Sequence, residues 1–525
     1  MDSSGGLRWR RLGSLKPIQT KKGAGKSYKK AEEDEQPLSP SARLFHEPDF
    51  NVHVTAIMGG DSPICPRLIK DNLVLSIQKH PRFSSLHVTD AKTGEMKWVR
   101  TKVDIEKHVL LRDITPLDLE QFGSPEKILE EYVYNLTKSS LDKSKPLWEL
   151  HILNLESSEI GRTGGFGIFR IHHSLGDGTS LMSLLLACTR QVDDPEKLPT
   201  IPGQDKNKKK ILESATTNRS TPGIKLFGMI WECVKRIWFL VELMWNTLVD
   251  VVMFGATTFF LKDTDTPIKA LPGSEFRPRR IVFRVVSLDD MKLIKNVMKM
   301  TINDVALGVT QAGLSRYLNR RYAEEKGHDN GATEKNNNLP KNIRLRSTLL
   351  INLRPSPGIQ ALADMMEKDT EAKWGNWIGF VLLPFKIELR DDPLDYVREA
   401  KSTIDRKKRS LEAVYTFSIS ELVLKFLGIK ASSALSHKII TRTTMCFSNL
   451  VGPQEEIGFY GHKISYLASG SYGQPHALMI NYQSYASKMS VVLSVDESVI
   501  PDPHQLLDDI QESLQLIKDA AIAAS

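Results

Sequence analysis

The chain has 525 residues, of which 41% are hydrophobic and 26% charged, and its formal net charge is +8 at pH 7. This length allows two or three domains with a sizeable core, and the composition is that of a globular protein. The four cysteines (Cys65, Cys188, Cys233 and Cys446) have no motif spacing, which excludes a disulfide framework and suits a reducing, cytosol-facing protein. The basic excess is mild, and we expect no nucleic-acid partner.

Residues 1–37 are predicted to be a disordered basic tail. Lysines and arginines are followed by the acidic run Glu32–Glu35, and few apolar residues are available to bury. No apolar stretch follows the basic residues, so the tail is not a signal peptide. Two roles stay open for it, a solvated tail or a weak attachment to anionic lipid headgroups.

Residues 38–190 are predicted to form a first domain in which strands and helices alternate. Ser124 and Pro125 are typical of an N-cap and a first helical position. The strand 148–153 could pair with a later strand, 166–171, and the mixture predicts an α+β fold with a mixed sheet. The other elements expected here are a strand at 51–58 and helices at 69–80 and 125–138.

The most informative stretch is His172-His173-Ser174-Leu175-Gly176-Asp177-Gly178. It follows the buried strand 166–171 and precedes a helix over 179–188, for which Thr179 or Ser180 is the expected N-cap. Neighbouring side chains on a strand point to opposite faces, so only one of the two histidines is expected to face a substrate.

A histidine at such a strand end can be a core residue, a metal ligand or a general base. No second His/Glu cluster and no CxxC pair accompanies it, so we expect no metal. Asp177 and the two glycines at a sharp turn indicate a specific loop geometry. The sequence lacks a G-x-S-x-G elbow, which argues against a Ser-His-Asp hydrolase.

Residues 191–272 are predicted to be a linker that contains a long apolar helix at about 226–261. This helix could span a bilayer, yet Glu242, Asn246 and Asp250 form one polar stripe along it. Trp231, Trp238 and Trp245 run beside the stripe. Three interpretations stay open: a helix in the plane of a membrane interface, a single span whose stripe packs on protein, and a helix buried in the soluble core. We favour the first, because a single span would separate the two predicted domains.

Residues 273–525 are predicted to form a second domain. Ser287 is expected to open a helix with an acidic first turn, and residues 324–342 read as a polar loop. The predicted strands are 280–286, 349–355, 377–384 and one ending at Phe447, followed by a turn at 448–453, a hairpin of 479–485 with 489–495, and helices at 301–322 and 501–523.

Four blocks occur in an order that resembles one known family. They are Pro146-Leu147-Trp148, the His172–Gly178 motif, Asn303-Asp304 and Ser448-Asn449-Leu450-Val451-Gly452-Pro453. Over residues 38–520 the chain resembles the plant-type bifunctional wax ester synthases/diacylglycerol acyltransferases of the HHxxxDG acyltransferase superfamily. The resemblance implies two chloramphenicol-acetyltransferase-like domains joined by a crossover, with a tunnel in which fatty acyl-CoA and the acceptor meet at His173.

The resemblance also implies roles for individual residues. His173 would be the base, with His172 beside it, and Asp177 would turn away from the substrates and hold the loop through a basic partner. Gly178 and the Pro-Leu-Trp block would support the motif. Asn303 and Asp304 could have a family role or could cap a helix.

The expected function is transfer of a long-chain acyl group from acyl-CoA to a long-chain alcohol, to diacylglycerol, or to both. A thioester is already activated, so neither an acyl-enzyme nor a cofactor is expected. The alternatives are an HxxxD-type acyltransferase for another alcohol or amine and an inactive lipid-binding relative, although the intact His173 and Asp177 speak against the latter. The expected partner surface is a lipid membrane of the endoplasmic reticulum, with cytosolic catalytic domains, or else the plasma membrane.

Overall fold

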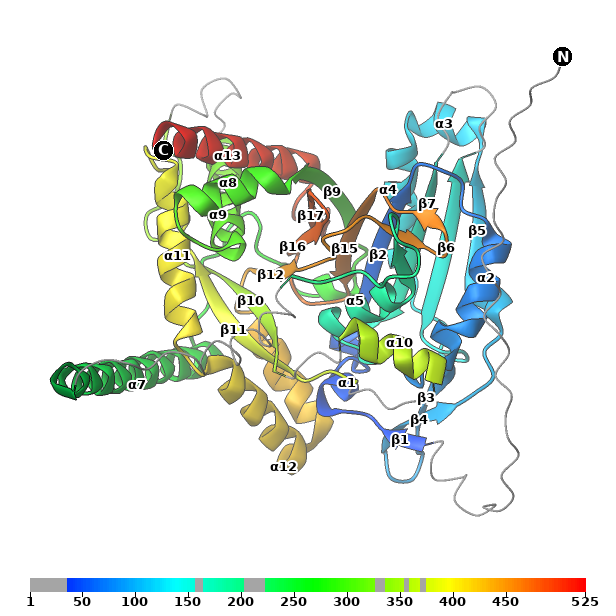
Figure 1. The fold of residues 1–525 in the computed structure, drawn as a ribbon, viewed down its shortest axis with the longest axis horizontal. Helices are drawn as coiled ribbons and strands as arrows, with labels where there is room; N and C mark the ends of the chain where they lie inside the picture. Colours follow the sequence, from blue (N-terminus) through cyan, green and yellow to red (C-terminus); the bar gives the residue numbers. More distant parts are fainter. Residues whose placement is uncertain (1–34, 156–163, 203–221, 326–335, 354–357, 369–373) are drawn as a thin grey trace.

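The computed structural model describes residues 35–155, 164–202, 222–325, 336–353, 358–368 and 374–525. Most of the predicted basic tail, and residues 203–221 of the predicted linker, therefore lie outside the described residues. The predicted C-terminal boundary of the tail, residue 37, is wrong, because residues 35–37 form strand β1 (Glu35–Pro37), which pairs with β4 (Met96–Arg100). Two bodies lie side by side, each built on one large sheet (Figure 1).

The first body is built on a five-stranded sheet. Two of its inner strands, β6 (Trp148–Leu155) and β7 (Gly165–His172), carry almost entirely buried side chains, as expected for strands covered on both faces. β6 and β7 are antiparallel, which confirms the predicted pairing of these strands. In sheet order the strands are β15 (Tyr466–Tyr472), β2 (His53–Gly60), β7 (Gly165–His172), β6 (Trp148–Leu155) and β5 (Val109–Ile114), with only β5 and β6 parallel.

The second body is built on a six-stranded sheet with mixed strand directions. In sheet order the strands are β11 (Ile378–Phe385), β10 (Leu345–Asn352), β12 (Met445–Leu450), β16 (Leu478–Tyr485), β17 (Lys488–Val495) and β9 (Arg280–Ser287). Helices α8 (Leu288–Val297), α9 (Ile302–Glu325), α11 (Leu394–Lys408) and α13 (Pro503–Ala523) pack on one another beside it (Figure 1). Their apolar faces and the sheet form the larger hydrophobic core.

The two halves of the chain are interleaved. β15 comes from the second half of the sequence, yet it pairs along its whole length with β2 of the first body. Helix α10 (Ile359–Lys368) likewise packs on α5 (Gly178–Ala187) of the first body. This is the crossover that the family resemblance implies, and it places segments before and after the apolar linker helix in one sheet.

Two long helices project from the second body. The apolar linker helix is α7 (Pro222–Phe259), and it extends away from the molecule (Figure 1). The other is α12 (Glu412–Ile440), which bends at Gly428, where φ is 80°. The remaining elements include α1 (Pro40–Leu44), α2 (Pro66–Leu75), β3 (Ser85–Thr89), α3 (Pro116–Phe122), α4 (Pro125–Thr137), β8 (Thr189–Gln191), β13 (Ile457–Phe459) and β14 (His462–Lys463).

Several predicted boundaries are confirmed and a few are wrong. Ser124 caps α4 as expected, and β16 and β17 form the predicted hairpin. The helix predicted at 69–80 instead begins at Pro66, which is well suited to a first turn, and ends at Leu75. β12 continues to Leu450 rather than ending at Phe447, because its neighbour β16 supplies hydrogen-bond partners that far.

Candidate active site

The His172–Gly178 motif forms the connection between β7 and α5. β7 ends at His172, residues His173–Leu175 form the single-turn 3-10 helix η5, and α5 begins at Gly178. The backbone N–H of His172 donates to the carbonyl of Leu147 (3.0 Å), and that of His173 donates to the carbonyl of Val52 (2.9 Å). The loop is therefore held by the residues that directly precede its two neighbouring strands, β6 and β2.

The Pro-Leu-Trp block has a structural role beside this loop. Leu147 supplies the carbonyl that holds His172. Trp148 is fully buried, and its Nε1–H donates to the carbonyl of Phe83 (2.8 Å). The block therefore anchors the start of β6 and, with it, the backbone of the histidine pair.

The two histidines have different neighbours, as the strand geometry predicts. Nδ1 of His172 accepts from the backbone N–H of Ser174 (3.3 Å), and its Nε2 lies 3.2 Å from Oδ1 of Asn51. Its ring stacks on His46, with centroids 4.6 Å apart. His173 instead stacks on Phe45 at 4.3 Å. Both nitrogens of His172 are thus occupied by protein groups.

His173 is held as a neutral imidazole. Only 8% of the residue is exposed, and burial lowers its pKa from 6.5 to about 4, because the charged form loses its hydration. At neutral pH the ring therefore carries a free nitrogen that can accept a proton.

Asp177 fixes the start of α5. Its side chain is buried, and Oδ1 accepts from the backbone N–H of Ser180 (2.8 Å), which makes Asp177 the N-cap. The predicted caps Thr179 and Ser180 are wrong, because aspartate caps equally well and lies where the chain leaves the extended conformation. The expected basic partner of Asp177 stays a prediction.

The two glycines of the loop differ in the space around them. A Cβ on Gly176 would lie 2.8 Å from the Trp374 ring, and the indole N–H of Trp374 donates to the Leu175 carbonyl. A larger residue at position 176 would therefore clash with Trp374. A Cβ on Gly178 would meet only Leu450, at 3.8 Å. Gly178 thus lies beside open space rather than in a tight contact.

That open space is an apolar cavity between α5 and the first sheet. Gly178 and Leu181 line it from α5, and Phe169 and Ile171 line it from β7. Leu450, from the predicted 448–453 block, closes it from the second body. Two sequence blocks far apart in the chain therefore meet beside the histidine loop, around a small apolar cavity of about 50 Å³.

Asn303 and Asp304 lie at the start of α9. Asp304 Oδ2 accepts from the backbone N–H of Thr301 (2.8 Å), and Thr301 Oγ1 accepts from the backbone N–H of Asp304 (3.3 Å). This reciprocal pair is a capping box, so the geometry favours the helix-cap interpretation of Asp304. Asn303 accepts a hydrogen bond from Asn449 and so joins two of the four blocks. Their role in the reaction stays a prediction.

Sequence reasoning missed two residues that contact His173. Phe45 covers one face of the imidazole. Asn376 is buried, and its Nδ2 donates to the carbonyls of His173 (2.8 Å) and Ser174 (3.3 Å) from the second body. The available signal was a polar residue within the aromatic run Trp374-Gly375-Asn376-Trp377, just before an apolar strand.

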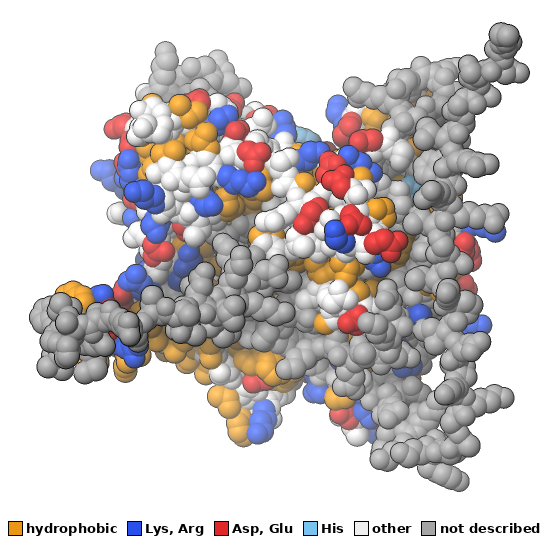
Figure 2. Space-filling view, viewed as in Figure 1, with side chains coloured by type: hydrophobic (Ala, Val, Ile, Leu, Met, Phe, Trp, Pro, Cys, Tyr) orange, Lys and Arg blue, Asp and Glu red, His pale blue; other side chains and the backbone are white. Residues whose placement is uncertain are grey.

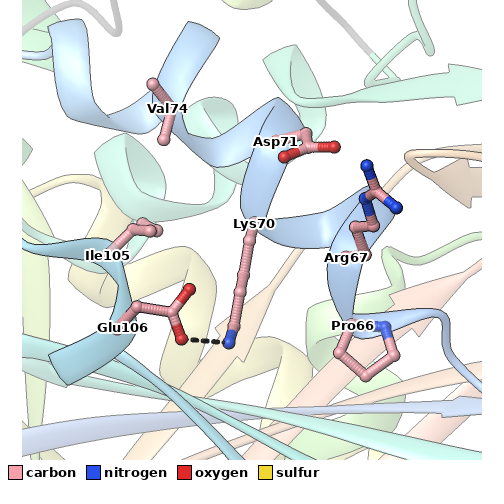
Figure 3. Close-up of a pocket in the computed structure, with 7 residues that line it drawn as sticks. All are labelled: Pro66, Arg67, Lys70, Asp71, Val74, Ile105 and Glu106. Atoms are coloured by element: carbon pink, nitrogen blue, oxygen red, sulfur yellow. Dashed lines mark hydrogen bonds and ion pairs between the residues drawn. The ribbon is translucent and has the colours of Figure 1, made fainter.

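A second hollow lies away from the motif. Figure 3 shows it beside α2, where Arg67 and Lys70 line one side. An ion pair of Lys70 with Glu106 crosses it. None of its lining residues belongs to the four sequence blocks, so we do not assign the reaction to this hollow.

Comparisons with known proteins decide the family. Residues 41–306 match the family model of the wax ester synthase/diacylglycerol acyltransferase catalytic domain, and residues 374–518 match that of the family's C-terminal domain. Wax ester synthase/diacylglycerol acyltransferase 11 of Arabidopsis thaliana is 49% identical over 95% of this chain and 98% of its own length. The chain belongs to the wax ester synthase/diacylglycerol acyltransferase family. The family predicted from the four blocks is thereby confirmed.

Solved structures confirm the predicted fold of this family member. A wax ester synthase/diacylglycerol acyltransferase from Marinobacter aquaeolei VT8 aligns with a TM-score of 0.55 at 16% identity, over 92% of this chain and 99% of that one. A trichothecene 15-O-acetyltransferase from Fusarium sporotrichioides aligns with a TM-score of 0.51 at 13% identity, over 92% and 95%. The α+β architecture of two chloramphenicol-acetyltransferase-like domains is therefore correct.

Proposed function

We propose that this protein transfers a long-chain acyl group from acyl-CoA to the hydroxyl of a long-chain alcohol, of diacylglycerol, or of both. It is an acyltransferase by family, and its relatives are named for wax ester and diacylglycerol acyl transfer. The observation that carries the proposal is the neutral, buried His173, which lies in the connection that also lines an apolar cavity.

The chemistry follows from these groups. The acceptor oxygen attacks the thioester carbonyl while His173 takes the hydroxyl proton. The carbon–sulfur bond then breaks, and the proton passes to the departing thiolate, which leaves as free CoA. The new ester remains. The charge stays balanced at each step, and no acyl-enzyme and no cofactor are needed.

The proposed activity can be tested with the full-length protein and palmitoyl-CoA. We expect free CoA to be released only when a long-chain alcohol or diacylglycerol is added, and product analysis with both acceptors present will give the preference. His173→Ala is the control and should lose nearly all of this CoA release. Lipid binding without CoA release from the wild type would favour the inactive lipid-binding alternative, and transfer to an amine would favour the other acyltransferase class.

We further propose that α7 attaches the protein to an endoplasmic reticulum-type membrane, with both domains on the cytosolic side. By length and composition Trp231–Phe259 could cross a membrane. The exposure of Ile237, Trp238 and Met244 argues against the core-helix interpretation. The pairing of β2 with β15 supports an in-plane or re-entrant helix, because the segments before and after α7 must share one side.

Protease protection in sealed microsomes tests this topology. With a tag at each terminus, both tags should be digested equally. Protection of one tag alone would contradict the in-plane arrangement. Full membrane binding after deletion of 230–260 would contradict the anchoring role of α7.

A further inference from the structure

The first half of α12 exposes large apolar side chains near its bend. Phe426 is 72% exposed and Leu427 69%, and Leu422 lies exposed one turn earlier. Scattered exposed apolar residues are ordinary, but a group of them at the end of a projecting helix marks an interaction surface. We call residues 422–430 the α12 tip.

The backbone presents this group outwards. Gly428 breaks the helix with φ 80° and ψ 177°, in a region that favours glycine. Two exposed lysines, Lys425 and Lys430, flank the apolar pair, whereas Glu421 is the acidic residue one turn before. An apolar point with a basic rim is complementary to a lipid surface that carries anionic headgroups.

The helix that carries the tip begins beside α7. The polar stripe of α7 faces the protein, where Glu242 pairs with Arg409 (2.6 Å) and Asp250 with Lys407 (2.9 Å). The backbone N–H of Leu411, just before α12, donates to Thr247 of α7 (3.0 Å). Figure 2 shows hydrophobic side chains below α7 and on the projection that α12 forms beneath it.

The second half of α12 leads from the tip towards the segment that covers His173. It packs against α1 and against the short 3-10 helix η1 (Pro48–Phe50). His437 makes an edge contact with Phe50, and Lys430 lies within electrostatic reach of Glu47. Glu47 is two residues from Phe45, whose ring lies on His173. The exposed apolar surface is thus joined through one helix to the segment that covers the base.

We infer that the α12 tip inserts into a lipid bilayer and that the acceptor dissolved in this bilayer enters from the α12 side and reaches the edge or the face of His173 that Phe45 leaves uncovered. The inference rests on the proposed function, because it concerns delivery of the acceptor to the same base. A bilayer fits better than a second protein copy. The basic rim matches anionic headgroups, α7 exposes large apolar side chains as the tip does, and the proposed acceptors partition into bilayers.

A fluorescent probe tests the docking without any catalysis. We would place Leu427→Cys in a Cys65→Ser/Cys233→Ser background, which removes the exposed thiols, and label it with an environment-sensitive dye. The control is Leu117→Cys on α3, where the side chain is 71% exposed. Vesicles of phosphatidylcholine and phosphatidylserine should blue-shift the dye at 427 and leave the dye at 117 unchanged. An unchanged spectrum at 427, or a shift that depends on protein concentration without lipid, would overturn the inference; the latter would assign the tip to a second copy.

Kinetics test the delivery. Phe426→Ser/Leu427→Ser should raise the apparent KM for hexadecanol presented in these vesicles by roughly 100-fold or more, the scale expected from losing burial of two apolar side chains. Transfer to a short, water-soluble alcohol and the behaviour of Leu117→Ser should match the wild type. Wild-type kinetics with vesicles, or an equal loss with both acceptors, would overturn the inference. Failure of the proposed function looks different, because the wild type itself would then acylate neither alcohol.

Discussion

The ring of Phe45 lies on the imidazole of His173, with centroids 4.3 Å apart and planes inclined by 30°. Phe45 follows α1 directly and is itself buried. It therefore excludes water from one face of the base, and substrate must approach the ring from its edge or its other face. The same burial lowers the pKa of His173, so this contact connects the packing of α1 to the chemistry of the site.

Replacement of the base is the first test of the site. His173→Ala should lower kcat by roughly 10²- to 10⁴-fold, the usual contribution of a general base. His172→Ala should cost less, because both ring nitrogens of His172 already contact Ser174 and Asn51. Circular dichroism would show that both variants fold. More than half of the wild-type rate in folded His173→Ala would refute its assignment as the base.

The pH dependence of the rate should reflect the lowered pKa of His173. The base must be neutral to act, and burial keeps it neutral down to about pH 4. As pH falls through 6.5, kcat/KM should therefore hold, and it should decline only nearer pH 4. Phe45→Ala exposes the ring, so its pKa rises and the decline should begin at higher pH. A wild-type decline centred at 6.5 would contradict the buried, neutral state.

The stability of the fold, unlike kcat/KM, should already decrease as the pH falls below about 6.5. Burial lowers the pKa of His46 to about 2 and that of His53 to about 3. In the unfolded chain these groups take up protons below about 6.5, so the unfolded state binds more protons there. Stability should then fall as pH drops below 6.5, by roughly 1.4 kcal/mol per pH unit for each such histidine.

Thermal unfolding between pH 7 and pH 5 checks this linkage. His46→Phe keeps an aromatic ring between His87 and His172 and should make Tm fall less between pH 7 and pH 5. His504→Gln is the control. Glu130 raises the pKa of His504, so protonation of His504 stabilises the folded state, and this variant should not reduce the fall in Tm. Equal slopes for the wild type and His46→Phe would show that the buried histidine does not contribute.

Much of this site was predictable because its determinants are local in sequence. The run 166–171 is apolar enough to specify a strand, and a strand end with two histidines and an Asp-Gly turn specifies the loop. The pattern even indicated that the histidines diverge, and their different contacts agree. The cap was misplaced by two or three residues because Asp177, Thr179 and Ser180 are all good caps, and only the backbone decides among them.

The rest depends on contacts across long sequence separations. Asn376 reaches His173 from another body, and β15 joins β2 across more than half of the chain. No local periodicity encodes such a pairing. For α7, the polar stripe through Glu242, Asn246 and Asp250 was predictable, but the partners of its two carboxylates were not: they are basic residues at and just after the end of α11.

Substitutions at Asp177 should separate its cap from its charge. Asp177→Ala removes the oxygen that accepts from Ser180 and should lower stability by about 1 kcal/mol, together with the rate. Asp177→Asn keeps a capping oxygen and should lower Tm less than alanine does, while the lost charge still reduces the rate. Chemical denaturation and kcat would be measured in parallel. Unchanged stability of both variants with a lost rate would instead indicate a direct catalytic role.

Asn376 should act as a positioning residue for the catalytic loop. Its Nδ2 holds the carbonyls of His173 and Ser174, at 2.8 and 3.3 Å, and the side chain is buried. Asn376→Asp replaces the donor by an oxygen that repels both carbonyls, and a buried acceptor without a partner costs about 1–3 kcal/mol. We expect kcat to fall because the imidazole is displaced, with KM for acyl-CoA nearly unchanged, and Tm to fall as well. Asn376→Gln retains the amide and should recover part of kcat, although its Tm should be similar to that of Asn376→Asp. If Asn376→Asp lowered Tm yet left kcat intact, the amide would only stabilise the contact between the two bodies and would not position His173.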